Sequence, residues 1–210
     1  MSALQPKIGK MTFEAEGTEG GPFHSRKLHV PSMTSGLTIG RGYDMKTKSP
    51  AKIIQDLTAA GIDRKDATTL SKASGLSGQS ANNFITKNKL EKYEISQQQQ
   101  VKLFEITYKE EEAETKRLCT KPDVTQKFGT CNWNTLDPAM KQVLVDLKFR
   151  GDYSAKIRDI LQSHVVANDT KGFLKDLSDQ SKWAAARQRV PNGRFQSRVN
   201  FLKTNTVIKP

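Results

Sequence analysis

The chain has 210 residues, and 34 Lys and Arg against 22 Asp and Glu give it a formal net charge of +12 at pH 7. A chain of this length can bury a hydrophobic core, so a scaffold held only by disulfides is unnecessary. The positive charge favours an anionic partner, but the basic residues are dispersed along the chain, so charge does not choose among nucleic acid, membrane surface and cell wall.

The N-terminus carries no apolar segment behind a basic start, and no stretch of the chain is apolar enough to span a membrane. We therefore expect neither a secretory signal peptide nor membrane insertion. If the substrate lies outside the cytoplasm, delivery needs another route, or the chain is a piece of a longer protein.

Residues 23–44 are rich in Gly, Ser, Thr and β-branched residues and predict a small β-hairpin region. Helical signals follow. Ser49 and Pro50 predict the start of a helix that ends at Gly61. Capping residues, glycines and apolar periodicity predict further helices over 63–73, 80–88, 96–118, 137–151, 153–166, 172–177 and 194–202.

These elements predict a mainly α fold of the α+β type, with a small N-terminal β-hairpin region and a helical lobe. We expect a single domain over residues 1–210. Within it, residues 13–48 form the sub-lobe that contains the hairpin, and residues 49–210 form the helical lobe.

Cys119 and Cys131 are the only cysteines. A disulfide between them would close a short loop and stabilise the fold by roughly 3 kcal/mol in an oxidising compartment, but two buried thiols are an equally good interpretation. His24 and His29 have no clustered cysteine or third histidine nearby, so we expect no metal site and treat both as polar loop residues.

The most informative residues lie in two stretches, 13–17 and 35–45, which read FEAEG and SGLTIGRGYDM. Glycines that alternate with Thr38, Arg41 and Tyr43 predict backbone that turns sharply, as at the floor of a cleft. Glycosidic cleavage needs a carboxylic acid that protonates the leaving oxygen and a carboxylate across the sugar. Glu16 and Asp44 are candidates for these roles, although by composition alone two surface acids and a hairpin turn explain the pattern better.

The order of these residues resembles the active-site entry of the phage lysozymes. It is more similar still to the phage-lysozyme-like muramidase domains of bacterial toxins and secreted effectors, the pesticin-like C-terminal domains. The resemblance covers the first 45 residues. It returns where Trp183, Pro191, Asn192, Arg194, Phe195 and Arg198 resemble the closing helix of that family.

The resemblance implies a lysozyme-like fold and three catalytic residues. Glu16 would be the general acid, Asp44 the carboxylate that activates water, and Thr38 a hydroxyl that holds the water. In ordinary phage lysozymes the aspartate precedes the threonine, whereas here Asp44 follows Thr38, as in the toxins. Glu14 and Glu19 lie close to Glu16 in the sequence, and Glu16 is favoured because a glycine follows it.

The function that the resemblance implies is hydrolysis of the β-1,4 bond between N-acetylmuramic acid and N-acetylglucosamine, with inversion and without a cofactor. Peptidoglycan glycan strands would be the substrate of a toxin or effector that is secreted or delivered to the target-cell periplasm, with a cognate immunity protein as partner. Two alternatives stay open: a non-catalytic wall-binding module, and a basic helical nucleic-acid binder, for which no recognition helix is evident.

Four further residues have two interpretations each. Arg194 and Arg198 share a helical face and favour ordinary ion pairing over support of a cleft. Arg41 and Tyr43 are candidates for sugar contacts, but Tyr43 is equally well explained as a core residue whose hydroxyl has a partner.

Overall fold

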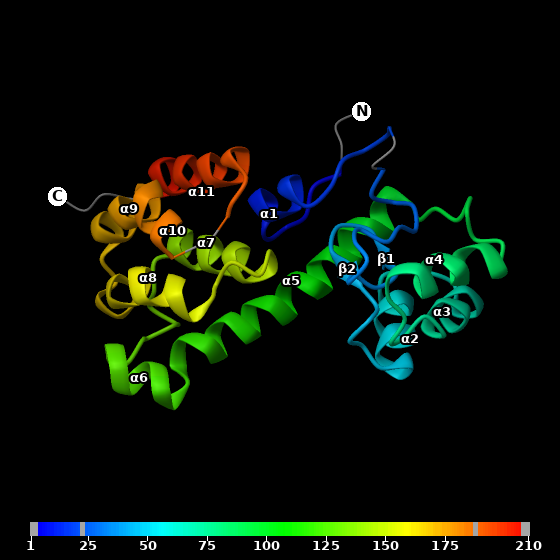
Figure 1. Ribbon diagram of the computed structural model, residues 1–210, viewed down its shortest axis with the longest axis horizontal. Helices are drawn as coiled ribbons and strands as arrows, with labels where there is room; N and C mark the ends of the chain where they lie inside the picture. Colours follow the sequence, from blue (N-terminus) through cyan, green and yellow to red (C-terminus); the bar gives the residue numbers. More distant parts are fainter. Residues whose placement is uncertain (1–3, 22–23, 187–188, 207–210) are drawn as a thin grey trace. The chain divides into compact units, whose positions relative to one another are not determined.

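The computed structural model describes residues 4–21, 24–186 and 189–206 (Figure 1). Within these ranges the chain is mainly helical and contains one small antiparallel sheet of two strands, which confirms the predicted mainly α class. The described residues form two compact units, one up to Thr107 and one from Tyr108 onward. No helix in these ranges is both long and apolar enough to cross a bilayer.

The first unit contains the short sheet and the helices that surround it. In chain order its elements are α1 (Lys10–Ala15), β1 (Thr38–Ile39), β2 (Tyr43–Asp44), α2 (Pro50–Ala59), α3 (Arg64–Ser71), α4 (Gly78–Lys87) and the beginning of α5 (Gln97–Thr120). The strands pair antiparallel, so that Thr38 lies opposite Asp44 and Ile39 opposite Tyr43. Gly40 and Gly42 form the connection with φ of 64° and 88°, a conformation that side chains with a Cβ rarely adopt.

Helices α2 and α3 begin where their capping residues predict. The Ser49 side chain accepts a hydrogen bond from the Lys52 N–H, and Pro50 occupies the first turn, where its missing N–H costs nothing. The Asp63 carboxylate accepts a hydrogen bond from the Lys65 N–H at 2.7 Å. Local capping chemistry is therefore sufficient to set these two helix starts.

A buried cluster holds the hairpin against the helices of the first unit. Its hairpin members are Leu37, Ile39, Tyr43 and Met45, each no more than 1% exposed. The helices supply Ile53, Leu57, Ala67, Leu70, Ala81 and Leu103, and Figure 1 shows α2, α3 and α4 beside the two strands. Burying one Leu or Ile side chain contributes about 1.5–3 kcal/mol, so this cluster fixes the position of the hairpin.

The regular part of the hairpin is shorter than the sequence predicts. Of the residues that the structure describes, four lie in strands, and His29 joins them through one isolated bridge to Thr38. Pro31 lies two residues after His29, and proline lacks the N–H that a ladder needs, so the pairing does not continue through it. Phe23, where the predicted region begins, lies outside the described residues.

The second unit is helical throughout its regular structure. It contains the remainder of α5 together with α6 (Pro122–Phe128), α7 (Pro138–Phe149), α8 (Ala155–Ala167), α9 (Thr170–Ser178), α10 (Gln180–Ala185) and α11 (Asn192–Asn205). The short helices α6 and α10 are absent from the sequence prediction. Each has only one strongly buried apolar anchor, Val124 and Trp183, so apolar periodicity could not reveal it.

Candidate functional site

A pocket of about 790 Å³ in the first unit contains two of the three residues predicted to be catalytic. Glu16 and Thr38 both line it. Asp44 is not among the residues that line it, and its position is described below. The other charged or titratable lining residues are His24, Lys27, His29 and Glu91, and Leu28, Val30 and Pro31 supply apolar surface.

Glu16 reaches the pocket because α1 ends directly before it. Helix α1 extends to Ala15, and Glu16 is its C-cap, with φ of −94° and a half-buried position. The following Gly17 passes close to Ser25, so that a Cβ on Gly17 would lie 2.7 Å from the Cβ of Ser25. The glycine thus allows the chain to turn tightly just after the acid.

Arg41 fixes the end of α1 to the hairpin. Its Nη1 donates hydrogen bonds to the carbonyl oxygens of Phe13 at 2.5 Å and Gly17 at 2.7 Å. Its guanidinium also lies 4.0 Å from the centre of the Phe13 ring, a favourable cation–π contact. Arg41 is only 8% exposed and does not line the pocket, so the structure assigns it to holding Glu16 in place rather than to contacting sugar.

The three glutamates near the end of α1 have different surroundings. Glu14 is exposed and pairs loosely with Lys10 at 3.7 Å. Glu19 accepts hydrogen bonds from Arg26 and Gln100 and lies 3.6 Å from Arg41. Of the three, Glu16 is the one that lines the pocket.

The charged neighbours of Glu19 keep it ionised. Burial opposes the charge and is the largest single influence on its pKa, but the hydrogen bonds from Arg26 and Gln100 and the charges of Arg26 and Arg41 outweigh it and lower the pKa of Glu19. Glu19 is therefore a structural carboxylate that orders the loop beside the pocket, not a proton donor.

Thr38 and Asp44 lie opposite each other in the hairpin and both contact Gly36. The Thr38 hydroxyl donates to the Gly36 carbonyl oxygen at 3.2 Å, and the Gly36 N–H donates to Asp44 Oδ2 at 3.0 Å. The backbone N–H of Lys46 donates to Asp44 Oδ1 at 2.8 Å. Residues directly opposite in an antiparallel pair project from the same face, so the Thr38 hydroxyl and the Asp44 carboxylate share one face of the hairpin.

Three residues that line the pocket, His24, His29 and Glu91, were not assigned to the site by the sequence analysis. His29 bridges to Thr38, and its Nδ1 donates to the Lys27 carbonyl oxygen at 2.9 Å. His24 accepts from the Gly20 N–H at Nδ1 and donates from Nε2 to Glu94. The position of the two histidines within the predicted hairpin region, shortly after the predicted acid, was the one available signal, and for Glu91 the sequence offered none.

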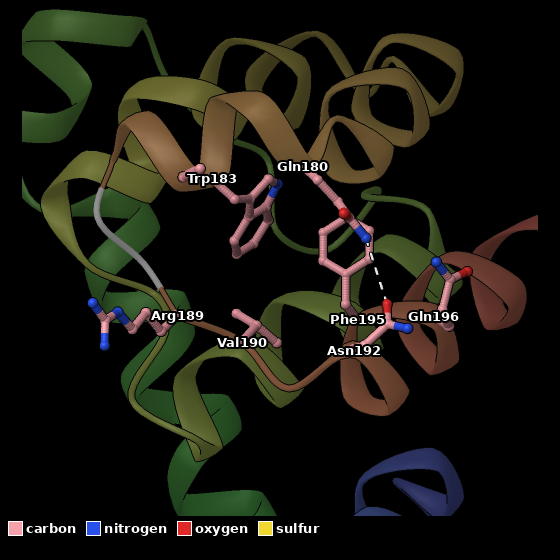
Figure 2. A pocket seen from close by; sticks show the side chains of 8 residues that line it. Gln180, Trp183, Arg189, Val190, Asn192, Phe195 and Gln196 are labelled. Carbon is pink, nitrogen blue, oxygen red and sulfur yellow. Dashed lines mark hydrogen bonds between the residues drawn. The ribbon is translucent and has the colours of Figure 1, made fainter.

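The second unit has a pocket of its own, of about 920 Å³, which Figure 2 shows. The Trp183 and Phe195 rings, 5.9 Å apart and edge to face, form its apolar side. Gln180 and Asn192, joined by a long hydrogen bond of 3.5 Å, lie at its edge. None of the lining residues that the structure describes is a carboxylate, so although this pocket is the larger of the two, its described lining lacks the groups that glycosidic cleavage needs.

The arginines of the closing helix are engaged in buried ion pairs. Arg194 and Arg198 both bind the carboxylate of Asp146, which is 0% exposed, with closest distances of 2.6 Å. Arg198 also lies 2.8 Å from Asp152. The ion-pairing interpretation of these two arginines is confirmed, and Tyr43, 1% exposed with its hydroxyl donating to Asp56 at 2.9 Å, is confirmed as a core residue.

Across residues 4–21, 24–186 and 189–206, no group of three His, Cys, Asp or Glu side chains is placed to hold a metal ion.

Comparison with known proteins gives one family. The model of a domain of unknown function, DUF8812, matches residues 9–199 of the chain. This span includes the residues that line both pockets. No curated protein matches the chain.

Proposed function

We propose that this chain, which belongs to the DUF8812 family, is a muramidase with a lysozyme-like fold that cleaves the β-1,4 bond between N-acetylmuramic acid and N-acetylglucosamine in peptidoglycan. The observation that carries the proposal is the convergence of Glu16 and Thr38 on one pocket, with Asp44 opposite Thr38 in the hairpin. The resemblance to the muramidase domains of bacterial toxins names these same three residues.

In this mechanism Glu16 donates the proton to the leaving oxygen. Its backbone is fixed by the end of α1 and by the bonds from Arg41 to the carbonyl oxygens on either side of it. A general acid must be held within hydrogen-bonding reach of the oxygen that it protonates, and such transfer contributes about 10²–10⁴-fold to the rate. The position of Glu16 at the pocket wall supports this role.

Thr38 and Asp44 hold and activate the water. Each oxygen of the Asp44 carboxylate accepts one backbone N–H bond, and a carboxylate has about four acceptor positions, so both oxygens retain room for a water proton. The Thr38 hydroxyl hydrogen is used by the Gly36 carbonyl, and its oxygen still accepts. A water that contacts both groups attacks from the side opposite the acid and inverts the anomeric carbon.

The charge of the chain suits this substrate. Peptidoglycan strands and the polymers attached to them are anionic, and a chain of net charge +12 attracts them in a salt-dependent way. Lys27 brings one positive charge to the pocket itself. A toxin or effector of this kind acts in the periplasm of a target cell, and the producing cell needs a cognate immunity protein.

The second candidate function is a wall-binding module without catalysis. The observation that favours it is the position of Asp44, which is held by two backbone N–H groups and lies outside the residues that line the Glu16 pocket. Such a module would bind peptidoglycan and release nothing. Salt-dependent binding of DNA without activity on peptidoglycan would instead support the nucleic-acid alternative.

The deciding experiment measures clearing of suspended purified peptidoglycan and analyses the released muropeptides. We expect soluble products with new reducing ends, because hydrolysis frees a hemiacetal at each cut. Anhydro-muramic ends would identify a lytic transglycosylase. Binding without release would identify the module.

The matched variants are Glu16→Gln and Glu14→Gln. We expect Glu16→Gln to lose about 10²-fold or more of the activity while it keeps the helical circular dichroism spectrum, because the amide has the shape of the acid but no acidic proton. Glu14→Gln should keep the activity of the parent chain, since Glu14 is exposed and outside the pocket. An active Glu16→Gln chain would refute the assignment of the acid.

The stereochemistry is a separate test of the water. Nuclear magnetic resonance of the first sugar released should show the α-anomer, as inversion at a β-linkage requires. Initial release of the β-anomer would overturn the inverting mechanism while leaving the hydrolase in place. Thr38→Ala should lose less rate than Glu16→Gln, because other hydrogen bonds can partly orient the water.

A further inference from the structure

A hollow of about 400 Å³ in the second unit gathers three lysines and shares no described lining residue with the proposed catalytic pocket. Lys109 and Lys116 reach it from α5, and Lys141 reaches it from α7. The rest of its described lining is Glu112, Ala113, Trp133 and Asn134. We propose that this hollow is a binding site for a phosphate dianion, carried by a phosphate monoester or by inorganic phosphate.

The periodicity of α5 places its contributions to the hollow on one face of the helix. Lys109 and Lys116 are seven residues apart in the sequence, which is close to two turns or about 10 Å along the helix axis. Glu112 lies between them, three residues after the first lysine and four before the second. Residues at these spacings share a helical face, so all three side chains border the same hollow.

The neighbouring acids of α5 do not neutralise these two lysines. Glu111 pairs with Lys148 at 2.7 Å, and Glu114 pairs with Arg117 at 2.6 Å. Within the ranges that the structure describes, neither of the two α5 lysines in the hollow makes an ion pair. With three lysines against one glutamate, the described lining has a net charge of +2 that is available to an external anion.

The side of the hollow that α5 does not supply is held in place before any ligand binds. Trp133 and Asn134 lie in the irregular segment between α6 and α7, where Cys131 and Trp133 are 5% and 6% exposed. Cys131 is, like Cys119, a free thiol, so packing rather than a cross-link holds this segment. The Lys141 Nζ donates to the Asn134 carbonyl oxygen at 3.2 Å, which positions the ammonium group and leaves two of its three donors for a ligand.

Trp133 adds a neutral hydrogen-bond donor to the three lysines. Among the described residues its indole N–H has no hydrogen-bond partner, and it is not sealed from solvent. An indole N–H is a donor only, so its partner must be an acceptor such as a phosphate oxygen. The indole of Trp133 therefore complements the same anion as the ammonium groups.

The chemistry of the lining fits a phosphate group better than a carboxylate. At pH 7 a phosphate monoester has a charge of about −1.5 to −2 and three strong acceptor oxygens, which matches the net charge of the lining and its several donors. A planar carboxylate suits the fork of an arginine, and no arginine is among the described lining residues. Glu112 offers an acceptor to a hydroxyl group beside the phosphate, which favours the ester of a sugar or polyol. The inference does not rest on the proposed function, because it requires neither peptidoglycan nor the Glu16 pocket.

The test titrates the full chain with inorganic phosphate and with glucose 6-phosphate at constant ionic strength, and follows the indole N–H signals of its two tryptophans by nuclear magnetic resonance. We expect a saturable shift of the Trp133 signal with millimolar ligand. The Trp183 signal should not move, because its N–H already donates to the Asp176 carbonyl oxygen at 3.2 Å. Tighter binding of glucose 6-phosphate would support an ester as the source of the phosphate, and equal binding would support free phosphate.

Three results of this titration would overturn the proposal. They are a Trp133 signal that does not shift, equal shifts of both indole signals, and binding of dimethyl phosphate, which has a single negative charge, as tight as that of inorganic phosphate. The Trp133→Phe variant assigns the two signals, because it removes one of them.

Charge variants test the lining directly. Lys109→Gln, Lys116→Gln and Lys141→Gln should each weaken phosphate binding by about tenfold, the loss expected for one charge-assisted hydrogen bond. Lys102→Gln is the matched control, because Lys102 is an exposed lysine of α5 outside the hollow, and it should keep the parent affinity. Glu112→Gln should tighten phosphate binding, since it removes the opposing charge. Equal losses in Lys102→Gln and Lys109→Gln would show that overall charge alone attracts phosphate and would refute the site.

Discussion

Asp44 is the residue on which the proposed chemistry depends most, because its carboxylate serves two purposes. It accepts the N–H groups of Gly36 and Lys46 and so closes the base of the hairpin. It also shares a hairpin face with Thr38, which lines the pocket. Glu91 is the competing candidate for the second carboxylate, because it lines the pocket directly. Unlike Asp44, it belongs to no helix or strand.

We predict that Asp44→Asn lowers the rate of peptidoglycan clearing by about 10²–10⁴-fold, because an amide is a poor base. Glu91→Gln should retain most of the rate. In Asp44→Asn, the amide NH₂ replaces one carboxylate oxygen and so faces a backbone N–H donor. Two donors cannot bond, so we expect a stability loss of about 1–3 kcal/mol. The midpoint of thermal unfolding is therefore measured on the same samples. A dead Glu91→Gln beside an active Asp44→Asn would exchange the two roles.

Glu19 makes a prediction about pH. Its pKa lies below the ordinary value of 4.5 in the folded chain, so its stabilising contribution is complete above about pH 4.5 and is lost as the pH falls through the folded pKa. Free energies of unfolding measured between about pH 5 and pH 3 should therefore fall less steeply in Glu19→Gln than in the parent chain. Glu14→Gln, which removes an exposed pair of 3.7 Å, should keep the parent slope. Equal slopes in the parent and Glu19→Gln would contradict the stabilised carboxylate.

At the scale of the element, the hairpin depends on a close approach at Gly36. A Cβ at this position would meet the Asp44 carboxylate, and it would lie 2.6 Å from the Cβ and 2.8 Å from the backbone nitrogen of Lys46. Because one of these close atoms belongs to the backbone of Lys46, the neighbouring chain can move little to relieve the contact. The glycine is therefore what allows the hairpin base and the Asp44 carboxylate to pack together.

We predict that Gly36→Ala destabilises the chain by about 1–3 kcal/mol, the range for overpacked positions, and lowers hydrolysis by displacing Asp44. Gly193→Ala is the matched control. A Cβ at Gly193, in the first turn of α11, has nothing within 4 Å, so the same substitution should leave both properties unchanged or stabilise by about 0.4–1 kcal/mol. Denaturant unfolding and the clearing assay test both variants, and a Gly36→Ala chain as stable and active as the parent would contradict the close packing.

At the scale of the whole molecule, the second unit is organised around buried charges. Asp146 on α7 is 0% exposed and binds two arginines of α11, Arg194 and Arg198. Arg198 is itself 1% exposed and also pairs with Asp152. Removing one partner from such a group leaves an uncompensated charge in a medium of low dielectric constant.

We predict that Asp146→Asn lowers the free energy of unfolding by about 3–5 kcal/mol. Asp159→Asn is the control, because Asp159 pairs with Lys127 at 2.6 Å while both side chains are more than half exposed. Exposed pairs of this kind contribute about 0–1 kcal/mol. Chemical denaturation with a circular dichroism readout compares the two, and equal losses would show that burial of the Asp146 pairs does not govern stability.

Several features of this protein were readable from the sequence because their causes are local. Ser49, Pro50 and Asp63 start helices through contacts with residues two or three positions away. The mainly α class and the early hairpin follow from periodicity, proline and glycine in the same way. The candidates Glu16, Thr38 and Asp44 came from the resemblance to the muramidase domains, which the order of acids, threonine and glycines carries, and their roles stay a proposal.

Other features were decided only by the tertiary structure, because they depend on residues distant in the chain. The sequence could not say that Arg41 binds the carbonyls of Phe13 and Gly17, nor that the arginines of α11 share Asp146. It also left open whether Cys119 and Cys131 form a disulfide or are two buried thiols. Partner choice in a folded chain is set by which side chains burial brings together, and burial is a property of the packed core rather than of any short stretch of sequence.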